Sequence, residues 1–448
     1  MRRRTFMQLA GAGALAGMLP LRGWAEGASD EEDDFDLAVV LNEIEALGPG
    51  QIQALVAGAI ETVELDTGET HPDGTPIVRS ILEPGAMMAS FPNPPITEEL
   101  LALLKGRKYW DQARADRETP VWPAKTSAPD YLHLTQYAAP SPDFVVSADV
   151  LRLLADRNSF LLNPEYPVIV FGLRGCKLPD GTDATGWVAE QPLTLAEPTH
   201  LDLDCVVGLW RQADGMIALF RAGTVPAVGY MFTSLVTQGS GTSLLPTGLY
   251  QYRRGHHLPN AKGIQRNALI MQGTYPVLRT AATLSYNPFL PTTAWTLGAG
   301  HNIHAGGPNF KYWSAGCQVV RGDYERSARI KTTGAWNDFR LMAGTADADG
   351  AAPAGGQAAF QYMLLTGLEA ALAYEGTQGF AESYKPLRFG AFGGRVAKLQ
   401  EFLESLYSND VRGLRPDGSF GTATSFAALI DSKVSQGDFA SPVVAGSW

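Results

Sequence analysis

The chain has 448 residues, of which 45% are hydrophobic and 18% are charged, and its formal net charge is −11 at pH 7. This length suffices for two or three domains with sizeable hydrophobic cores. The excess of acidic side chains argues against a nucleic-acid-binding protein and against a basic patch for anionic membranes.

The N-terminal segment has the features of an export signal. Basic residues at 2–4 precede an apolar run at 9–21, and Gly23 and Ala25 supply the small side chains at the −3 and −1 positions of a cleavage site. The apolar run is too short for a transmembrane helix, which needs about 20 residues. The basic start resembles a twin-arginine signal. We therefore expect residues 1–28 to be a signal peptide, and the mature protein to lie in the periplasm without a membrane partner.

Residues 29–160 carry no motif to which a function can be assigned. Consecutive acidic residues at 30–34 indicate a solvated linker rather than a metal site. The segment that follows is rich in proline and predicts an irregular, partly helical region. Helices are expected to begin at the capping residues Thr97 and Ser147.

From residue 167 onward the pattern changes to short strands, rich in β-branched and aromatic residues and separated by Gly and Pro turns. We predict a mostly antiparallel β-sandwich or barrel-like domain over residues 161–375, within an α+β multidomain chain. The sequence has no Gly-rich phosphate loop and no alternating strands and helices, which argues against nucleotide chemistry. The predicted strands lie at 167–171, 205–210, 216–220, 268–271 and 360–365.

A linker at about 376–386 leads to a small C-terminal α-helical domain, predicted over residues 386–432. Two short amphipathic helices are expected there. The second is expected to be capped by Thr422, after an Asp-Gly turn. The predicted inward-facing side chains are Val396, Leu399, Phe402 and Leu403 in the first helix, and Phe426 and Leu429 in the second.

Cys317 has surroundings suited to nucleophilic catalysis. A free thiol has a pKa of about 8.5, so at neutral pH it needs a base to become a good nucleophile. His301 and His304 lie 16 and 13 positions upstream, far enough for their strand to return beside the cysteine. Ala315 and Gly316 precede the thiol, and their small side chains leave room for a substrate and for backbone N–H groups that face a developing oxyanion.

The segments 301–307 and 314–320 resemble the catalytic signature of the YkuD-type L,D-transpeptidases, a His-Gly element followed by Ser-His-Gly-Cys. The resemblance extends over roughly residues 165–370. It implies that Cys317 is the nucleophile and that His304 is its base, with the ring oriented by the carbonyl of the next residue, Ala305. It also implies that backbone N–H groups of Ala315, Gly316 and Cys317 hold the oxyanion.

Two positions depart from that signature. Ala315 stands where the family has a second histidine. The arginine common shortly after the cysteine is missing at that spacing, since Gln318 follows and Arg321 is the nearest arginine. These departures imply an altered substrate geometry, as in a divergent subgroup that joins unusual stem positions.

The C-terminal helices resemble the peptidoglycan-binding helical domain, through Leu399 and Gln400 in the first helix and the turn at 417–421 before the last. Together the two resemblances imply an enzyme that cross-links peptidoglycan stem peptides through a cysteine thioacyl-enzyme, with diaminopimelate as acceptor and no cofactor. Its partners would be stem peptides and glycan. Two alternatives stay open: a carboxypeptidase or endopeptidase in which water resolves the thioester, and a non-catalytic wall-binding protein.

Other side chains near the cysteine have several candidate roles. Ser314 and Arg321 are candidates for binding substrate, through a hydroxyl group and a charge-assisted hydrogen bond. Tyr312 and Trp313 either wall the acyl pocket or belong to the core. His301 is either a partner behind the base or a turn residue.

A second pair of histidines, His256 and His257, follows Arg253 and Arg254. The pair is expected at the surface. The sharper hypothesis is that these four side chains contact carboxylates of a stem peptide.

The cysteines and histidines leave two further alternatives. Cys176 and Cys205 either form a disulfide in the oxidising periplasm or stay separate buried thiols. A zinc site made of His301, His304 and Cys317 is the metal alternative. No carboxylate stands near them in an HExxH-like pattern, so no metal is expected.

Overall fold

The computed structural model describes two strands near the N-terminus, β1 (Val63–Thr70) and β2 (Pro76–Ile81), and most of the chain from residue 128 to 445. The signal predicted at 1–28 and the helix predicted from Thr97 lie outside the described residues. The gaps in the second part are 199, 201, 228–241, 258–265, 280–294, 307–311, 313, 326–330, 377–379 and 437–440.

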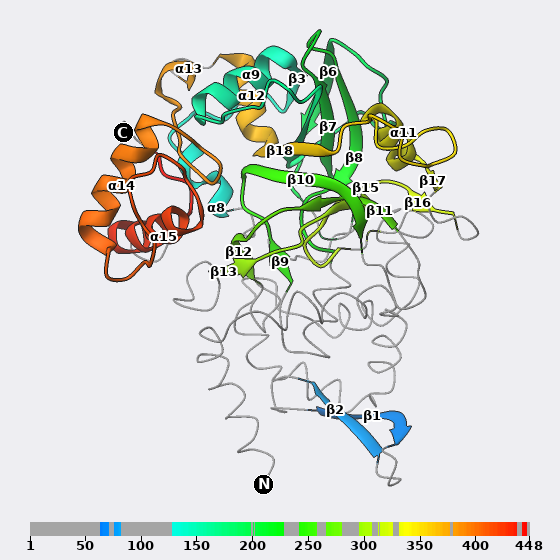
Figure 1. Ribbon diagram of the computed structural model, residues 1–448, viewed down its shortest axis with the longest axis horizontal. Helices are drawn as coiled ribbons and strands as arrows, with labels where there is room; N and C mark the ends of the chain where they lie inside the picture. The colour runs from blue at the N-terminus through cyan, green and yellow to red at the C-terminus, as the bar shows by residue number, and fades with distance from the viewer. Residues whose placement is uncertain are drawn as a thin grey trace.

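Eight strands close into a barrel (Figure 1). They are β4 (Val168–Arg174), β7 (Cys205–Arg211), β8 (Ile217–Gly223), β10 (Gly248–His257), β11 (Arg266–Met271), β14 (Ile303–Ala305), β15 (Gln318–Val320) and β18 (Ala359–Thr366). Their order is β10-β11-β14-β15-β8-β7-β4-β18, and only the pairs β14–β15 and β18–β4 are parallel. The chain is therefore an α+β protein built on a mostly antiparallel barrel, and each of the five strands predicted from the sequence is present.

Alternation along the strands sorts side chains between the barrel interior and its outer face. In β14, Ile303 and Ala305 belong to the interior core, so His304 between them faces outward. The helix α11 (Ala335–Met342) packs Phe339 on the same core. The outer face at β14 and β15 is therefore where polar side chains can gather.

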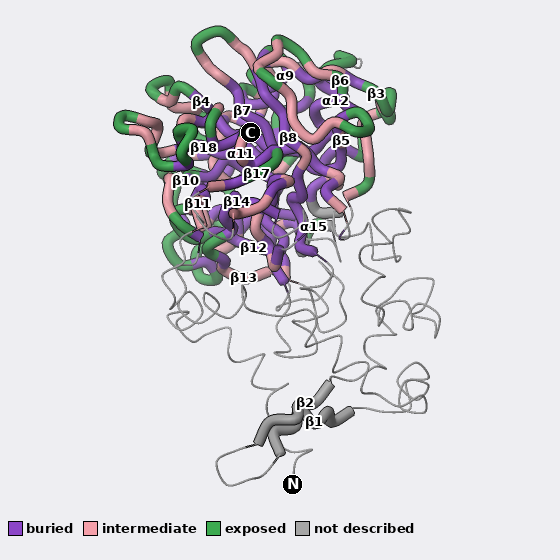
Figure 2. The backbone as a smooth tube through the Cα atoms, turned by 90° about the vertical axis from the view of Figure 1, so that its right-hand side faces the viewer, coloured by how far each residue is buried: buried purple, intermediate pink, exposed green. Residues whose placement is uncertain are grey.

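A second core covers the outer side of the barrel at β4, β7 and β18 and continues into a layer of helices and short strands, as the buried segments of Figure 2 show. Its elements are α8 (Ala128–Tyr131), η4 (Leu132–Leu134), β3 (Asp143–Ser147), α9 (Ala148–Arg157), β5 (Cys176–Lys177), β6 (Glu190–Leu195), α12 (Gly367–Glu375) and α13 (Phe380–Ser383). The helix predicted to begin at Ser147 is α9, and the Ser147 side chain accepts from the Val150 N–H. The end of the N-terminal region, from residue 128, is thus part of the core.

The remaining strands form small sheets beside the barrel. They are β9 (Ser243–Leu244), β12 (Tyr275–Arg279) and β13 (Trp295–Gly298) in one sheet, and β16 (Asp323–Tyr324) and β17 (Thr332–Thr333) in another. Among the described residues no helix is long and apolar enough to cross a membrane. Cys176 and Cys205 are separate, buried, free thiols, so the disulfide alternative is not realised.

Two helices, α14 (Gly394–Tyr407) and α15 (Thr422–Gln436), form the C-terminal helical unit. Two expectations are wrong here. Phe402 is 40% exposed, because its position six residues after the buried Val396 lies about 120° around the helix from that residue. Thr422 is the first residue of α15 rather than its cap, and its hydroxyl donates to the Thr274 carbonyl beside β12 (2.9 Å).

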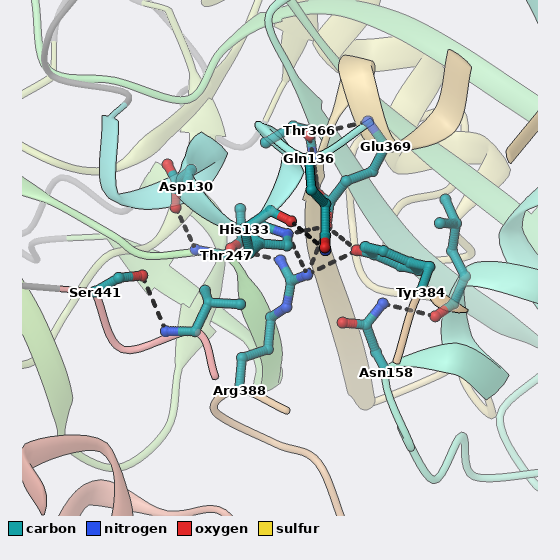
Figure 3. A network of polar contacts seen from close by, with 12 residues as sticks. Asp130, His133, Gln136, Asn158, Thr247, Thr366, Glu369, Tyr384, Arg388 and Ser441 are labelled. Atoms are coloured by element: carbon teal, nitrogen blue, oxygen red, sulfur yellow. Dashed lines mark hydrogen bonds and ion pairs between the residues drawn. The ribbon is translucent and has the colours of Figure 1, made fainter. Parts of the chain in front are cut away.

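A buried network of charges joins the segment before α14 to α12, to η4 and to the residue before β10 (Figure 3). The Arg388 guanidinium donates to the Glu369 carboxylate (2.5 Å) and to the Thr247 hydroxyl (2.7 Å), and it lies 3.2 Å from His133 Nε2. All four side chains are buried. Within the segment predicted as a linker, 376–386, the side chains of Phe380 and Tyr384 are buried in the second core.

Candidate active site

The parallel pairing of β14 with β15 brings the predicted nucleophile and base together. In this register His304 lies opposite Val319, and Cys317 immediately precedes β15. One ring nitrogen of His304 lies within 4.8 Å of the Cys317 Sγ. Cys317 is half-buried, so the thiol can meet a substrate. A thiol and an imidazole at this separation need only a small movement for proton transfer.

His304 is set up to accept that proton. Its Nδ1 donates a hydrogen bond to the Ala305 carbonyl (2.7 Å), which is the orientation expected from the sequence, and the Nε2 lone pair is left for the thiol. Burial lowers the pKa of His304 to about 4; the hydrogen bond to Ala305 opposes this shift and Arg266 adds to it. The ring is therefore neutral at pH 7, which is the form that acts as a base.

The residues before the thiol form a tight turn. The Ser314 hydroxyl donates to the Cys317 carbonyl (2.7 Å) and accepts from the Gly316 N–H (3.0 Å). The Ala315 carbonyl accepts from the Ser243 N–H (2.9 Å). Gly316 has a φ of 159°, and a Cβ there would stand 2.7 Å from the Ser243 carbonyl. The Ser314 hydroxyl therefore stabilises the turn, and the Gly316 N–H that was predicted to face the oxyanion donates to this hydroxyl.

His301 lies behind this turn. Its backbone N–H donates to the Tyr275 hydroxyl (3.0 Å), which in turn donates to His301 Nδ1 (2.9 Å). The ring proton is therefore on Nε2, which lies near the Ser243 carbonyl and 2.8 Å from where a Gly316 Cβ would be. Of the two roles expected for His301, the structure favours a partner that supports the turn from behind.

Two predicted site residues are engaged elsewhere. Arg321 donates to the Asp183 carboxylate (2.8 Å) and lies four residues beyond Cys317, about 13 Å along an extended chain. Tyr312 is buried against Val319, and its hydroxyl donates to the Val225 carbonyl, so it belongs to the core. The structure does not bring either side chain to the thiol. Trp313 lies outside the described residues.

A second imidazole lies in the site. The expectation of a surface pair holds for His256, which is exposed, and is wrong for His257, which is buried. The His257 ring stacks on that of His304, with centroids 4.4 Å apart and 12° between the ring planes. Alternation along β10 could have placed residue 257 on the outer face, but only the pairing of β10, β11 and β14 shows that His304 is its neighbour.

His257, His304 and Cys317 are also the one group of potential metal ligands found among the described residues. In each ring Nδ1 is engaged, in His304 with the Ala305 carbonyl and in His257 with Asn302 Nδ2, so a shared ion would have to bind both Nε2 atoms. The predicted zinc alternative included His301 in place of His257. The Nε2 of His301 faces Gly316, so the predicted set is not the group that the described residues bring together.

The low pKa of His304 predicts thiol reactivity that persists in weak acid. An ordinary imidazole has a pKa of about 6.5 and stops acting as a base below that pH. Since burial lowers the pKa of His304 to about 4, the acid limb of the alkylation rate of Cys317 by iodoacetamide is expected near pH 4. Rates measured from pH 3.5 to 8 check this. An acid midpoint near 6.5 would contradict it, and His256→Gln, at an exposed position, should leave the profile unchanged.

Comparisons of the chain with protein-family models, with curated proteins and with solved structures gave no match.

Proposed function

We propose that the protein is a cysteine-dependent L,D-transpeptidase that cross-links peptidoglycan stem peptides in the periplasm. The observation that carries the proposal is a half-buried thiol beside a neutral imidazole whose tautomer is set by a backbone carbonyl. This arrangement suits acyl transfer, because the base is poised to activate the nucleophile and then to protonate a leaving group. The substrate class is implied by the resemblance of residues 301–320 and 399–421 to enzymes and binding domains of the cell wall.

The proposed reaction has two halves. His304 Nε2 takes the Cys317 proton, the thiolate attacks a donor-stem carbonyl carbon, and the resulting imidazolium gives its proton to the departing amine. A thioester on Cys317 remains. An amine of the acceptor stem, most simply that of diaminopimelate, then attacks the thioester and loses a proton to His304. The new amide leaves, and the thiolate regains a proton from the imidazolium.

The C-terminal helical unit supports a polymeric wall substrate. Its helix α15 lies against β12, through Thr422 and Thr274, and β12 begins with Tyr275, which holds His301 behind the thiol-bearing turn. A wall-binding unit in this place would stay at a fixed distance from the thiol. Water in place of the acceptor amine would make the same site a carboxypeptidase or endopeptidase.

The test is the thioacyl-enzyme itself. Purified protein is mixed with disaccharide-tetrapeptide muropeptides, quenched in acid and analysed by intact mass, and the adduct is mapped by proteolysis. The expected result is a mass increase on the peptide that contains Cys317, together with muropeptide dimers in the supernatant. An adduct with shortened monomers and no dimers identifies a hydrolase. A protein that stays unmodified with all muropeptides intact identifies a non-catalytic wall-binding protein.

A further inference from the structure

We propose that His257 is a working part of the site, as a hydrogen-bond donor to the Cys317 thiolate, and that Asn302 holds it in the tautomer this requires. The proposal rests on the proposed function, in that it assigns a role at the same nucleophile. The two imidazoles then have different roles: His304 removes the proton of the thiol, and His257 stabilises the negative charge on the sulfur.

The tautomer of His257 follows from a chain of hydrogen bonds. The Met271 backbone N–H donates to Asn302 Oδ1 (3.0 Å), and because an N–H can only donate, this fixes which end of the amide is oxygen. The other end, Asn302 Nδ2, lies 2.9 Å from His257 Nδ1 and must be the donor. His257 Nδ1 is therefore an acceptor, and the single proton of the neutral ring sits on Nε2.

The two stacked rings thus carry opposite tautomers. His304 has its proton on Nδ1, facing the Ala305 carbonyl, and offers a lone pair. His257 accepts at Nδ1 and offers an N–H at Nε2. One ring nitrogen of each histidine lies within 4.8 Å of the Cys317 Sγ. A Cys317 thiolate would lie beside His304, which has taken the proton of the thiol, and beside His257, which can donate a hydrogen bond to the sulfur.

His257 stays neutral while it does this. Burial lowers the pKa of His257 well below its ordinary value, and the nearby His304 lowers it further. Since stacked imidazolium rings repel each other, the proton taken from the thiol is held by His304 alone. A neutral N–H donor stabilises the thiolate without competing for that proton.

The strand between β10 and β14 carries a small side chain that leaves space for the His257 ring. His257 lies on β10, and β11 separates that strand from β14. Gly255 pairs with Ala268, and Leu269 pairs with Ile303, so the small Ala268 lies next to His304 on the intervening strand. A larger side chain at 268 would occupy the outer face between β10 and β14. The contact between the two imidazoles therefore depends on a small residue in the strand between them.

The experiment compares three variants. His257→Phe keeps a flat ring for stacking and removes the donor, His257→Gln keeps an amide N–H near the position of Nε2, and His256→Phe is the matched control on the same strand. The measurement is the alkylation rate constant of Cys317 with iodoacetamide at pH 7, with thermal melting to show that each variant is folded. Cys317 must be read out by peptide mapping, because Cys176 and Cys205 are also free thiols.

The expected result for His257→Phe is a decrease of about ten-fold or more, since a hydrogen bond to a charged group is lost. His257→Gln should recover much of that rate, and His256→Phe should match the wild type. A purely structural role predicts instead that the phenylalanine variant keeps the rate and that glutamine gives no advantage over it. Equal alkylation rates in the wild type and in a folded His257→Phe protein would overturn the proposal. If the phenylalanine variant does not fold, a His257→Gln protein that is alkylated as slowly as a His304→Gln protein would overturn it.

Failure of this proposal and failure of the proposed function give different results. Alkylation needs no wall substrate, so a ten-fold effect of His257→Phe supports the role of His257 even if muropeptides leave Cys317 unmodified. In the reverse case, thioacyl-enzyme forms on the wild type while the alkylation rate is the same with and without His257.

Discussion

The Cys317→Ala protein is expected to form no muropeptide dimers, with a decrease on the order of 10⁴-fold or more, because the nucleophile is removed while the base has no other thiol to activate. The substitution should leave the fold intact. The Cys317 side chain is half-buried and its hydrogen bond to the Gly300 carbonyl is long (3.5 Å). Binding to isolated sacculi is expected to persist, since α14 and α15 keep their core. Dimer formation by mass spectrometry and sedimentation with sacculi measure the two properties.

Cys176→Ala is the matched control, because Cys176 is a free thiol that is fully buried in β5 and away from the site. Dimer formation should be unchanged in this variant. Dimers from Cys317→Ala at the wild-type rate would contradict the role of Cys317 as nucleophile. Loss of sacculus binding in the same variant would show that the thiol, rather than the helical unit, engages the wall.

Replacing Arg388 with methionine is expected to lower the free energy of unfolding by about 3–5 kcal/mol, which is the usual result of breaking a fully buried ion pair. The substitution leaves the Glu369 carboxylate buried without its main counter-charge. Burial by itself raises the pKa of Glu369, but Arg388, with help from His133, more than offsets this and holds it below the usual range. In the variant the carboxyl group must either stay charged at a high cost or take up a proton. Urea denaturation at pH 7 measures the change.

The free energy of unfolding should also depend on pH differently in the wild type and in Arg388→Met. A carboxyl group whose pKa is lowered in the folded state stabilises the protein above its ordinary pKa, and this contribution is lost as the pH falls. The stability of the wild type should therefore fall below about pH 4, and that of Arg388→Met should fall less steeply there. The exposed pair Arg152–Asp149 supplies the control: Arg152→Met should leave the denaturation midpoint unchanged. An equal effect of the two substitutions would contradict the structural role of the buried network.

Five of the barrel strands and the start of α9 were predictable because they are encoded in neighbouring residues. Short apolar runs rich in β-branched and aromatic residues marked β7 and β8, and a serine before an apolar stretch marked the start of α9 at Ser147. The proximity of Cys317 and His304 was expected from the family signature, and the parallel register of β14 and β15 brings a ring nitrogen of His304 within 4.8 Å of the Cys317 Sγ. Even the hydrogen bond from His304 to the Ala305 carbonyl is a contact between neighbours.

Two of the side chains singled out in the sequence have partners that are distant in sequence. Arg321, a candidate for binding substrate, donates to Asp183, which is 138 residues away. Thr422 was expected to cap its own helix and instead donates to the Thr274 carbonyl. A hydroxyl or a guanidinium can satisfy several kinds of partner, and the local sequence does not say which one the fold will supply.

By itself the sequence determined the α+β composition and five of the barrel strands, and it singled out Cys317 and His304, because each of these rests on the side chains of neighbouring residues or on a motif within one short segment. Only the tertiary structure decided that His257 stacks on His304, that Asn302 sets its tautomer, and that Arg388, just before α14, pairs with Glu369 of α12. These contacts arise where strands and helices from separate parts of the chain are packed against one another. Their geometry depends on register and closure of the sheet, which no local pattern records.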